Sequence, residues 1–278
     1  MLRNQFTTSL ARFALVAAGM SAAITSAAAQ GVGDLLVAPT RLELNNFRGT
    51  EVFLNNIGTE KATYRVSVEL RRMDADGELH ELEPGEVTEL QKKVQDMVVF
   101  APRRITLEPN EPQSIRVGVR PPPDLPDGEY RVHLLFRAIP EPRPAEAPNP
   151  QGISIDLRAI YGVTIPVFAR RGQLTAEAGI VDARLVQQDG QPAVSVTLTR
   201  QGSRSLYGDV LVMKPGRSEP VLKASGVAIY TEVDRRGVVL ALPKDSTVSL
   251  AGPATIRFVE RTEDGLRRTL AETSVNLR

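Results

Sequence analysis

The chain has 278 residues, of which 42% are apolar and 24% are charged, and its formal net charge at pH 7 is +1. These values are typical of a globular protein, and the near-neutral charge argues against nucleic acid or an anionic membrane as the main partner. The absence of cysteine excludes a catalytic thiol and a cysteine-based metal site. At ~150 residues per domain, the length favours two domains.

The first 29 residues have the pattern of a secretory signal peptide. Arg3 and Arg12 accompany a short apolar stretch, Phe13–Ile24, and small residues follow at Ser26–Ala29. The apolar stretch is shorter than the ~20 residues that span a bilayer, so we expect cleavage near residue 29 and no stable membrane anchor. The remaining chain carries 32 basic and 33 acidic residues and is expected to be exported.

Residues 30–170 form the first predicted domain, which is a series of short strands. Alternating apolar residues and the turn signals between them predict strands at 35–44, 50–57, 62–70, 97–100, 105–107, 113–119 and 129–139. Asp74–Gly77 is a strong turn signal. The polar stretch Leu79–Gln95 predicts a loop with a short strand, and Gly85–Lys93 is the only candidate helix. Strands at this spacing predict an all-β sandwich.

The stretch Gly152–Arg170 shows the longest alternation in the chain. Its odd-numbered positions are apolar, whereas Ser154, Asp156 and Arg158 alternate with them. This is the pattern of a strand with one apolar face, and it exceeds the ~5–6 residues of a typical strand. Such a strand either extends a second sheet or offers its edge to another chain.

Residues 171–278 form the second predicted domain, which begins at Arg171-Gly172. Seven further strands are predicted at 174–185, 193–199, 207–213, 221–230, 238–242, 254–261 and 270–277. Turn signals such as Asp189-Gly190 and Pro215-Gly216 separate them. The pattern indicates a second β-sandwich.

The sequence offers no basis for catalysis or for a metal site. The two histidines, His80 and His133, have no acidic or histidine partner at ligand spacing and are expected at the surface or half-buried. Asp74 and Asp76 resemble the start of a calcium loop, but Gly77 fits a turn and the later glutamate ligand is missing. We therefore expect no enzyme activity, no cofactor and no metal.

Two interpretations of Arg41 remain open from the sequence. Arg41 lies on the first predicted strand beside apolar residues, where its stem could pack while its head group stays solvated. Alternatively, its guanidinium could bind a carboxylate. Glu129 and Arg170 are equally compatible with ordinary surface charges.

Several segments taken together resemble the periplasmic pilus-assembly chaperones of the chaperone–usher pathway. They are Ala38–Arg41, Phe100–Pro109, Ser114–Val117, Leu125–Arg131, Phe136–Pro140 and Pro166–Arg170. Their order and spacing match that family over Leu35–Arg170, whereas the second domain matches only in position and strand content. The resemblance implies two immunoglobulin-like β-sandwiches joined at an angle.

The resemblance also implies a function and partners. Such chaperones stabilise incomplete pilus subunits in the periplasm by donor-strand complementation and deliver them to an outer-membrane usher. The residues expected to form the donor face are Ile153, Ile155, Leu157, Ala159 and Tyr161. The loop Glu141–Pro150 is then either a mere linker or a segment that is mobile without a subunit.

Individual site residues follow from the resemblance position by position. Arg41 aligns with the cleft arginine that holds the subunit's C-terminal carboxylate, and Glu129 and Arg170 align with an interdomain ion-pair network. The family's cleft lysine has no counterpart, because Pro166 or Thr164 occupies its position. The acidic partner of Arg170 in the second domain is not identified.

Two other classes of protein compete with the chaperone interpretation. A structural or adhesive component of a surface fibre should carry an alternating extension before its first strand, and Gly31–Asp34 is too short for one. A periplasmic hydrolase or sugar-binding protein would need a polar or aromatic cluster that the sequence does not show.

Overall fold

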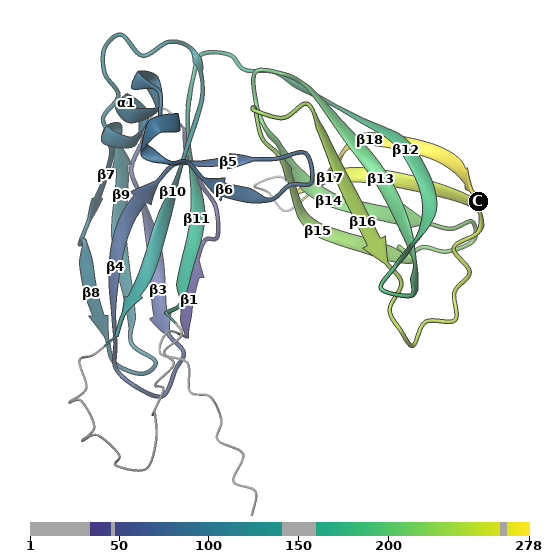
Figure 1. Ribbon diagram of the computed structural model, residues 1–278, viewed down its shortest axis with the longest axis horizontal. Helices are drawn as coiled ribbons and strands as arrows, with labels where there is room; N and C mark the ends of the chain where they lie inside the picture. Colours follow the sequence, from purple (N-terminus) through teal and green to yellow (C-terminus); the bar gives the residue numbers. More distant parts are fainter. Residues whose placement is uncertain (1–33, 46–47, 141–159, 262–265) are drawn as a thin grey trace, which may run out of the picture. The chain divides into compact units, whose positions relative to one another are not determined.

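The computed structural model describes residues 34–45, 48–140, 160–261 and 266–278 (Figure 1). The predicted signal peptide, the proline-rich loop and the donor-face residues Ile153, Ile155, Leu157 and Ala159 lie outside these ranges. Within them the chain forms eighteen strands, one α-helix and one 3-10 turn. The prediction of an all-β fold is confirmed.

The first sandwich consists of two facing sheets. One sheet has the order β1 (Leu35–Ala38), β3 (Thr50–Asn56), β9 (Pro112–Val119), β7 (Val98–Ala101). The other has the order β2 (Leu42–Asn45), β11 (Gly162–Arg171), β10 (Gly128–Ile139), β4 (Ala62–Glu69), β8 (Arg104–Leu107). Their central strands follow the immunoglobulin-like pairing, ABED in one sheet and CFG in the other.

The alternation of each strand places one set of side chains between these sheets. Tyr64, Leu107, Leu134 and Phe136 are among the fully buried members of this core. Burial of one such side chain contributes roughly 1.5–3 kcal/mol. The other set of side chains covers the outer faces, and on the β10–β11 sheet this outer face carries most of the features that concern function.

The first predicted strand, 35–44, is wrong as a single element. β1 pairs with β3 in one sheet, whereas β2 runs parallel to β11 in the other. Pro39 lies at the crossing, where it cannot donate a backbone hydrogen bond to either sheet. The same change of sheet separates β7 from β8 at Pro102.

The region between β4 and β7 also differs from the prediction. β5 (Arg71–Met73) and β6 (Leu79–Glu81) form a hairpin whose turn contains Gly77 at a φ of 86°, and a 3-10 turn follows at Pro84–Glu86. The candidate helix at 85–93 was misplaced, because α1 spans Glu89–Met97. Thr88 begins it by accepting a hydrogen bond from the Gln91 N–H, a capping box visible in the sequence. No helix in the described ranges is long and apolar enough to cross a membrane.

The second sandwich follows the predicted seven strands closely. One sheet contains β12 (Ala176–Gln188), β13 (Gln191–Gly202) and β16 (Arg235–Ala241). The other contains β15 (Leu222–Ile229), β14 (Leu206–Met213), β17 (Gly252–Arg261) and β18 (Arg267–Leu277). This sandwich has its own hydrophobic core, although backbone contacts place Gly31–Arg278 in one unit. The domain boundary at residue 170 therefore stays a prediction.

Candidate functional site

Strand β11 has different neighbours along its two halves. On one side it pairs with β10 over its whole length, from Gly162 to Arg171. On the other side β2 pairs only with Val167–Arg170. The outer edge of Gly162–Pro166 therefore has no strand partner among the described residues.

The backbone groups on this open edge can be identified from the register. The Ala138 N–H donates to the Tyr161 carbonyl at 3.0 Å, so odd-numbered residues of β11 direct their backbone groups toward β10. Gly162 and Thr164 consequently direct their N–H and C=O groups away from β10. Pro166 is also an outward position, and its missing N–H is tolerated at an open edge.

The long predicted strand is only partly tested. Its described part begins at Gly162, and Ile160 and Tyr161 precede β11 without a strand assignment. Tyr161, a predicted donor-face residue, has 52% of its surface exposed. The apolar positions that continue this alternation, Ile165 and Val167, are buried in the first core.

Arg41 lies just before β2 and is largely buried. Its side chain is 12% exposed, and its Nε donates to Glu43 Oε1 at 2.9 Å. Its guanidinium lies 3.8 Å from the ring centroid of Phe168 and 4.8 Å from that of Tyr207, which is cation–π geometry. Its Nη1 is buried without a hydrogen-bond partner in the described part of the chain. Arg41 Nη1 is thus a buried donor whose hydrogen-bonding capacity is unused within the described residues.

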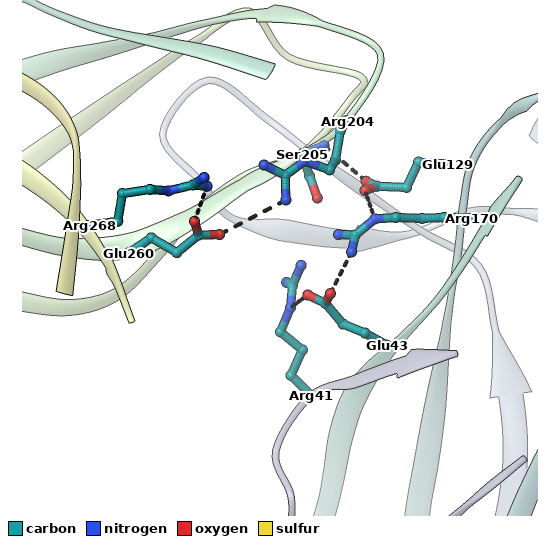
Figure 2. A network of polar contacts seen from close by, with 8 residues as sticks. All are labelled: Arg41, Glu43, Glu129, Arg170, Arg204, Ser205, Glu260 and Arg268. Atoms are coloured by element: carbon teal, nitrogen blue, oxygen red, sulfur yellow. Dashed lines mark hydrogen bonds and ion pairs between the residues drawn. The ribbon is translucent and has the colours of Figure 1, made fainter. Parts of the chain in front are cut away.

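Arg170 and Glu129, the predicted interdomain pair, contact each other. Arg170 Nε donates to Glu129 Oε2 at 2.8 Å, and Arg170 Nη1 also pairs with Glu43. The backbone N–H of Ser205, in the second sandwich, donates to Glu129 Oε1 at 3.1 Å. Figure 2 shows this series of contacts from Arg41 to Ser205. Both acidic partners of Arg170, Glu43 and Glu129, belong to the first sandwich. The predicted acidic partner in the second sandwich is not found among the described residues.

Glu43 connects the two arginines electrostatically. Burial alone would raise the pKa of the Glu43 carboxyl, but Arg170 and Arg41 outweigh burial and lower that pKa below its usual value. Burial would likewise lower the pKa of Arg170, but Glu43 and Glu129 raise it. Glu43 is therefore ionised at neutral pH. Its position two residues after Arg41, on the same face of the strand, was a sequence signal that the prediction missed.

A second charged contact joins the two sandwiches, between Arg131 and Glu232. The sequence analysis did not predict it. Arg131 donates to Glu232 from Nη2 at 2.6 Å and from Nη1 at 3.1 Å. The Met73 N–H donates to the same carboxylate at 2.8 Å. The Arg131 guanidinium also lies 3.8 Å from the ring centroid of Tyr230. Glu232, an acid of the second sandwich, thus pairs with Arg131 rather than with Arg170.

Aromatic residues fill the space between these charged groups. Phe168 and Tyr230 are almost fully buried, and their ring centroids are 5.7 Å apart. Met73 and Ala228 complete this small cluster. Phe168 occupies an even-numbered position of β11, whose side chains point away from the first core. An apolar residue at such a position indicates that the outer face is covered there, which the alternation alone did not reveal.

The prediction for His133 is wrong, because only 1% of this residue is exposed. It lies opposite Pro166 on the neighbouring strand, which the sequence resemblance aligns with a cleft lysine. Burial, followed by the charges of Arg131 and Arg71, lowers the pKa of His133 to about 3. His133 is therefore neutral at physiological pH and does not replace the cationic lysine.

The prediction that His80 has no acidic partner is also wrong. Its Nε2 lies 2.9 Å from Asp74 Oδ2, and the ligand atoms of Asp74, Glu78 and His80 all lie within 4.8 Å of one another. Asp74 also accepts the backbone N–H groups of Asp76 and Glu78. The group is largely exposed, and its hydrogen bonds are those of a hairpin turn.

Comparisons with known proteins give only remote likenesses. No family model and no curated protein sequence matches the chain. Among solved structures, the Pseudomonas aeruginosa CupB2 chaperone is similar at 13% identity and a TM-score of 0.48, over 87% of this chain and 100% of that one. The YadV chaperone is similar at 13% identity and a TM-score of 0.46, over 88% and 100%.

A structure of Salmonella enterica SafA pilin in complex with the SafB chaperone is similar at 16% identity and a TM-score of 0.43, over 87% of this chain and 96% of that one. TM-scores of this size are too low to establish a common fold, and identities of this size do not indicate common partners.

Proposed function

We propose that the protein is a periplasmic chaperone that stabilises incomplete pilus or fimbrial subunits and delivers them to an outer-membrane usher. It contributes a donor strand from the segment before β11 together with the open edge of β11, and no catalysis or cofactor is involved. The proposal includes export through a cleaved signal peptide.

The open half of β11 is the observation that carries this proposal. Gly162–Pro166 has a strand partner on one side only, and it directly follows the alternating segment Ile153–Tyr161. An unpaired edge beside an apolar alternating segment invites pairing with another chain. A subunit that lacks a strand would gain backbone hydrogen bonds from Gly162 and Thr164 and apolar side chains from the preceding segment.

Arg41 supports the proposal at a second point. Glu43, Phe168 and Tyr207 hold its guanidinium in place, while its Nη1 keeps an unused donor. We infer that this donor binds the terminal carboxylate of a subunit. The same arrangement compensates for the missing cleft lysine, because the rings orient the guanidinium before a ligand arrives.

The test is capture of a subunit by the tagged protein. The full chain is co-expressed with a set of pilus subunits that each lack a strand, and complexes are purified from the periplasm. We expect one or more subunits to co-purify with the wild type, and the Ile155→Asp and Leu157→Asp variants to lose them. Val239→Asp is the matched control, because Val239 is an exposed apolar strand residue of the second sandwich.

Arg41→Ala tests the carboxylate role separately. It should abolish co-purification while the protein stays folded, and Arg116→Ala should leave capture unchanged because the Arg116 side chain is 86% exposed. Failure of the wild type to capture any subunit would overturn the proposed function. Undiminished capture by Arg41→Ala would overturn only the role of Arg41.

A further inference from the structure

Three arginines lie side by side across the sheet that contains β11. In the register of the strands, Arg137 on β10 is opposite Arg65 on β4, and Arg65 is opposite Arg104 on β8. All three are exposed, whereas both chain neighbours of Arg65 and of Arg137, and Ile105 after Arg104, are buried in the core. The three side chains therefore share the outer face, about 4.8 Å apart from strand to strand. We call this row the arginine ladder.

No acidic residue neutralises the arginine ladder in the described part of the chain. The ion pairs of the first sandwich within the described ranges involve other residues, and the guanidinium of Arg103, beside the ladder, lies 5.0 Å from the ring centroid of Phe100. Arg65, Arg103 and Arg104 line a hollow of about 600 Å³, in which Asp96 is the one acidic residue. Like charges directly opposite each other destabilise a sheet, so the row opposes folding stability.

Protection of a sheet edge does not explain the ladder. Charged residues on an edge strand discourage aggregation, and this accounts for Arg104, because β8 is the last strand of its sheet. Arg65 and Arg137 lie on β4 and β10, which are interior strands. Their unpaired charges face outward from the middle of the sheet, where another molecule can contact them.

The ladder ends at the open edge of β11. Arg137 is opposite Gly162, the first residue of the strand, and Gly162 has no side chain to stand between Arg137 and the edge. A Cβ at Gly162 would lie 3.0 Å from Leu135 Cδ1, so the apolar Leu135 side chain, and no charged one, lies over the glycine. A strand added to this edge would lie two spacings of ~4.8 Å from β10. An extended arginine and a facing glutamate together span that distance.

We propose that the arginine ladder selects the partner by charge: Arg137 binds acidic side chains on the face of the protein strand that pairs with β11, and Arg65 and Arg104, on the next two strands of the sheet, add to the positive potential of that face. The inference rests on the proposed function, since it requires a strand at that edge, and it adds a property of the partner. A basic row next to a pairing edge favours acidic strands over basic ones, because like charges brought together at an interface are costly.

The experiment measures binding of two labelled peptides to the full protein by fluorescence anisotropy. One peptide alternates valine and aspartate over about twelve residues, and the other alternates valine and lysine. We expect the aspartate peptide to bind at least ~tenfold more tightly than the lysine peptide at low salt, and the difference to shrink as salt screens it.

Variants of the arginine ladder test whether the ladder causes the tighter binding of the aspartate peptide. Replacing Arg65, Arg104 and Arg137 together by glutamine should remove the preference for the aspartate peptide, and Arg137→Gln alone should reduce it. Arg217→Gln is the matched control, because Arg217 is an exposed arginine of the second sandwich that forms no ion pair with the described residues. Circular dichroism verifies that each variant is folded. If the triple variant does not fold, the Arg137→Gln variant alone still tests the preference.

Three outcomes would overturn the inference: equal binding of both peptides, an unchanged preference in the ladder variants, or tight binding of heparin without binding of the aspartate peptide. The last result would indicate a general polyanion site. Because the peptides replace the subunit, failure here is distinguishable from failure to capture a subunit, which tests the proposed function itself.

Discussion

Two groups of arginines lie on the same sheet of the first sandwich and differ in their partners. Arg170 pairs with Glu129 and Glu43, and Glu43 also binds Arg41. The arginine ladder, on strands β10, β4 and β8 of the same sheet, has no acidic partner among the described residues. The paired group coincides with the half of β11 that β2 covers, and the ladder with the open half. The charges of the paired group are neutralised by ion pairs within the protein, whereas those of the arginine ladder, near the open edge, are available to the proposed partner.

Arg170→Met should give the largest effect on stability. The variant leaves Glu43 and Glu129 without their shared cation, and Glu129 has a side chain only 2% exposed. Removing one partner of such a buried pair costs about 3 kcal/mol. Urea unfolding measures this loss. A loss no larger than that of Arg217→Met, an exposed control, would contradict the account of the paired group.

His133 should make folding stability depend on pH. Its pKa falls to about 3 in the fold, so between that value and about 6.5, the usual histidine pKa, the unfolded chain binds a proton that the native state does not. Stability is therefore fully present above pH ~6.5 and is lost as the pH falls, by about 2 kcal/mol at pH ~5. Urea unfolding at several pH values should show this slope in the wild type. An equal slope in His133→Leu would contradict the assignment.

Glu232→Gln should have a smaller effect, confined to the β5–β6 hairpin. The change weakens the contact with Arg131, whose side chain is 9% exposed, and should cost about 1.5 kcal/mol. The Met73 amide, which donates to Glu232, should exchange its hydrogen faster by NMR. Unchanged exchange at Met73 would show that Glu232 does not hold the hairpin.

Arg65→Gln should give the smallest effect, with the opposite sign. Removing the middle charge of the ladder relieves repulsion from Arg137 and Arg104, and should raise the free energy of unfolding by about 0.5 kcal/mol at low salt. The gain should disappear at high salt. Destabilisation instead would mean that Arg65 has a partner within the protein.

The sequence predicted the second sandwich well, because its strands are continuous and each stays within one sheet. It failed at residues 35–44, where alternation continues across Pro39 while the chain changes sheets. The helix predicted at 85–93 lies at Glu89–Met97 in the structure. Its start is marked by the Thr88 capping signal, which stands within a polar stretch and not at the candidate's first residue. Alternation also cannot show what covers an outer face, so the burial of Phe168 and His133 was not foreseen.

The candidate site was predictable only in part. Arg41, Glu129 and Arg170 followed from the resemblance, and Glu129 and Arg170 do contact each other. Their further partners, Glu43 and the Ser205 N–H, depend on chain segments far apart in the sequence. The arginine ladder depends on register across three strands, and a shift of one residue would move each arginine to the other face.

Amide hydrogen exchange along β11 tests the central claim most directly, namely that one half of this strand is reserved for a partner. In the free protein, we predict that the Gly162 and Thr164 amides exchange much faster than those of Phe168 and Arg170, which face β2. In complex with a captured subunit, Gly162 and Thr164 should become protected. Slow exchange of these two amides in the free protein, or no added protection in the complex, would contradict the account.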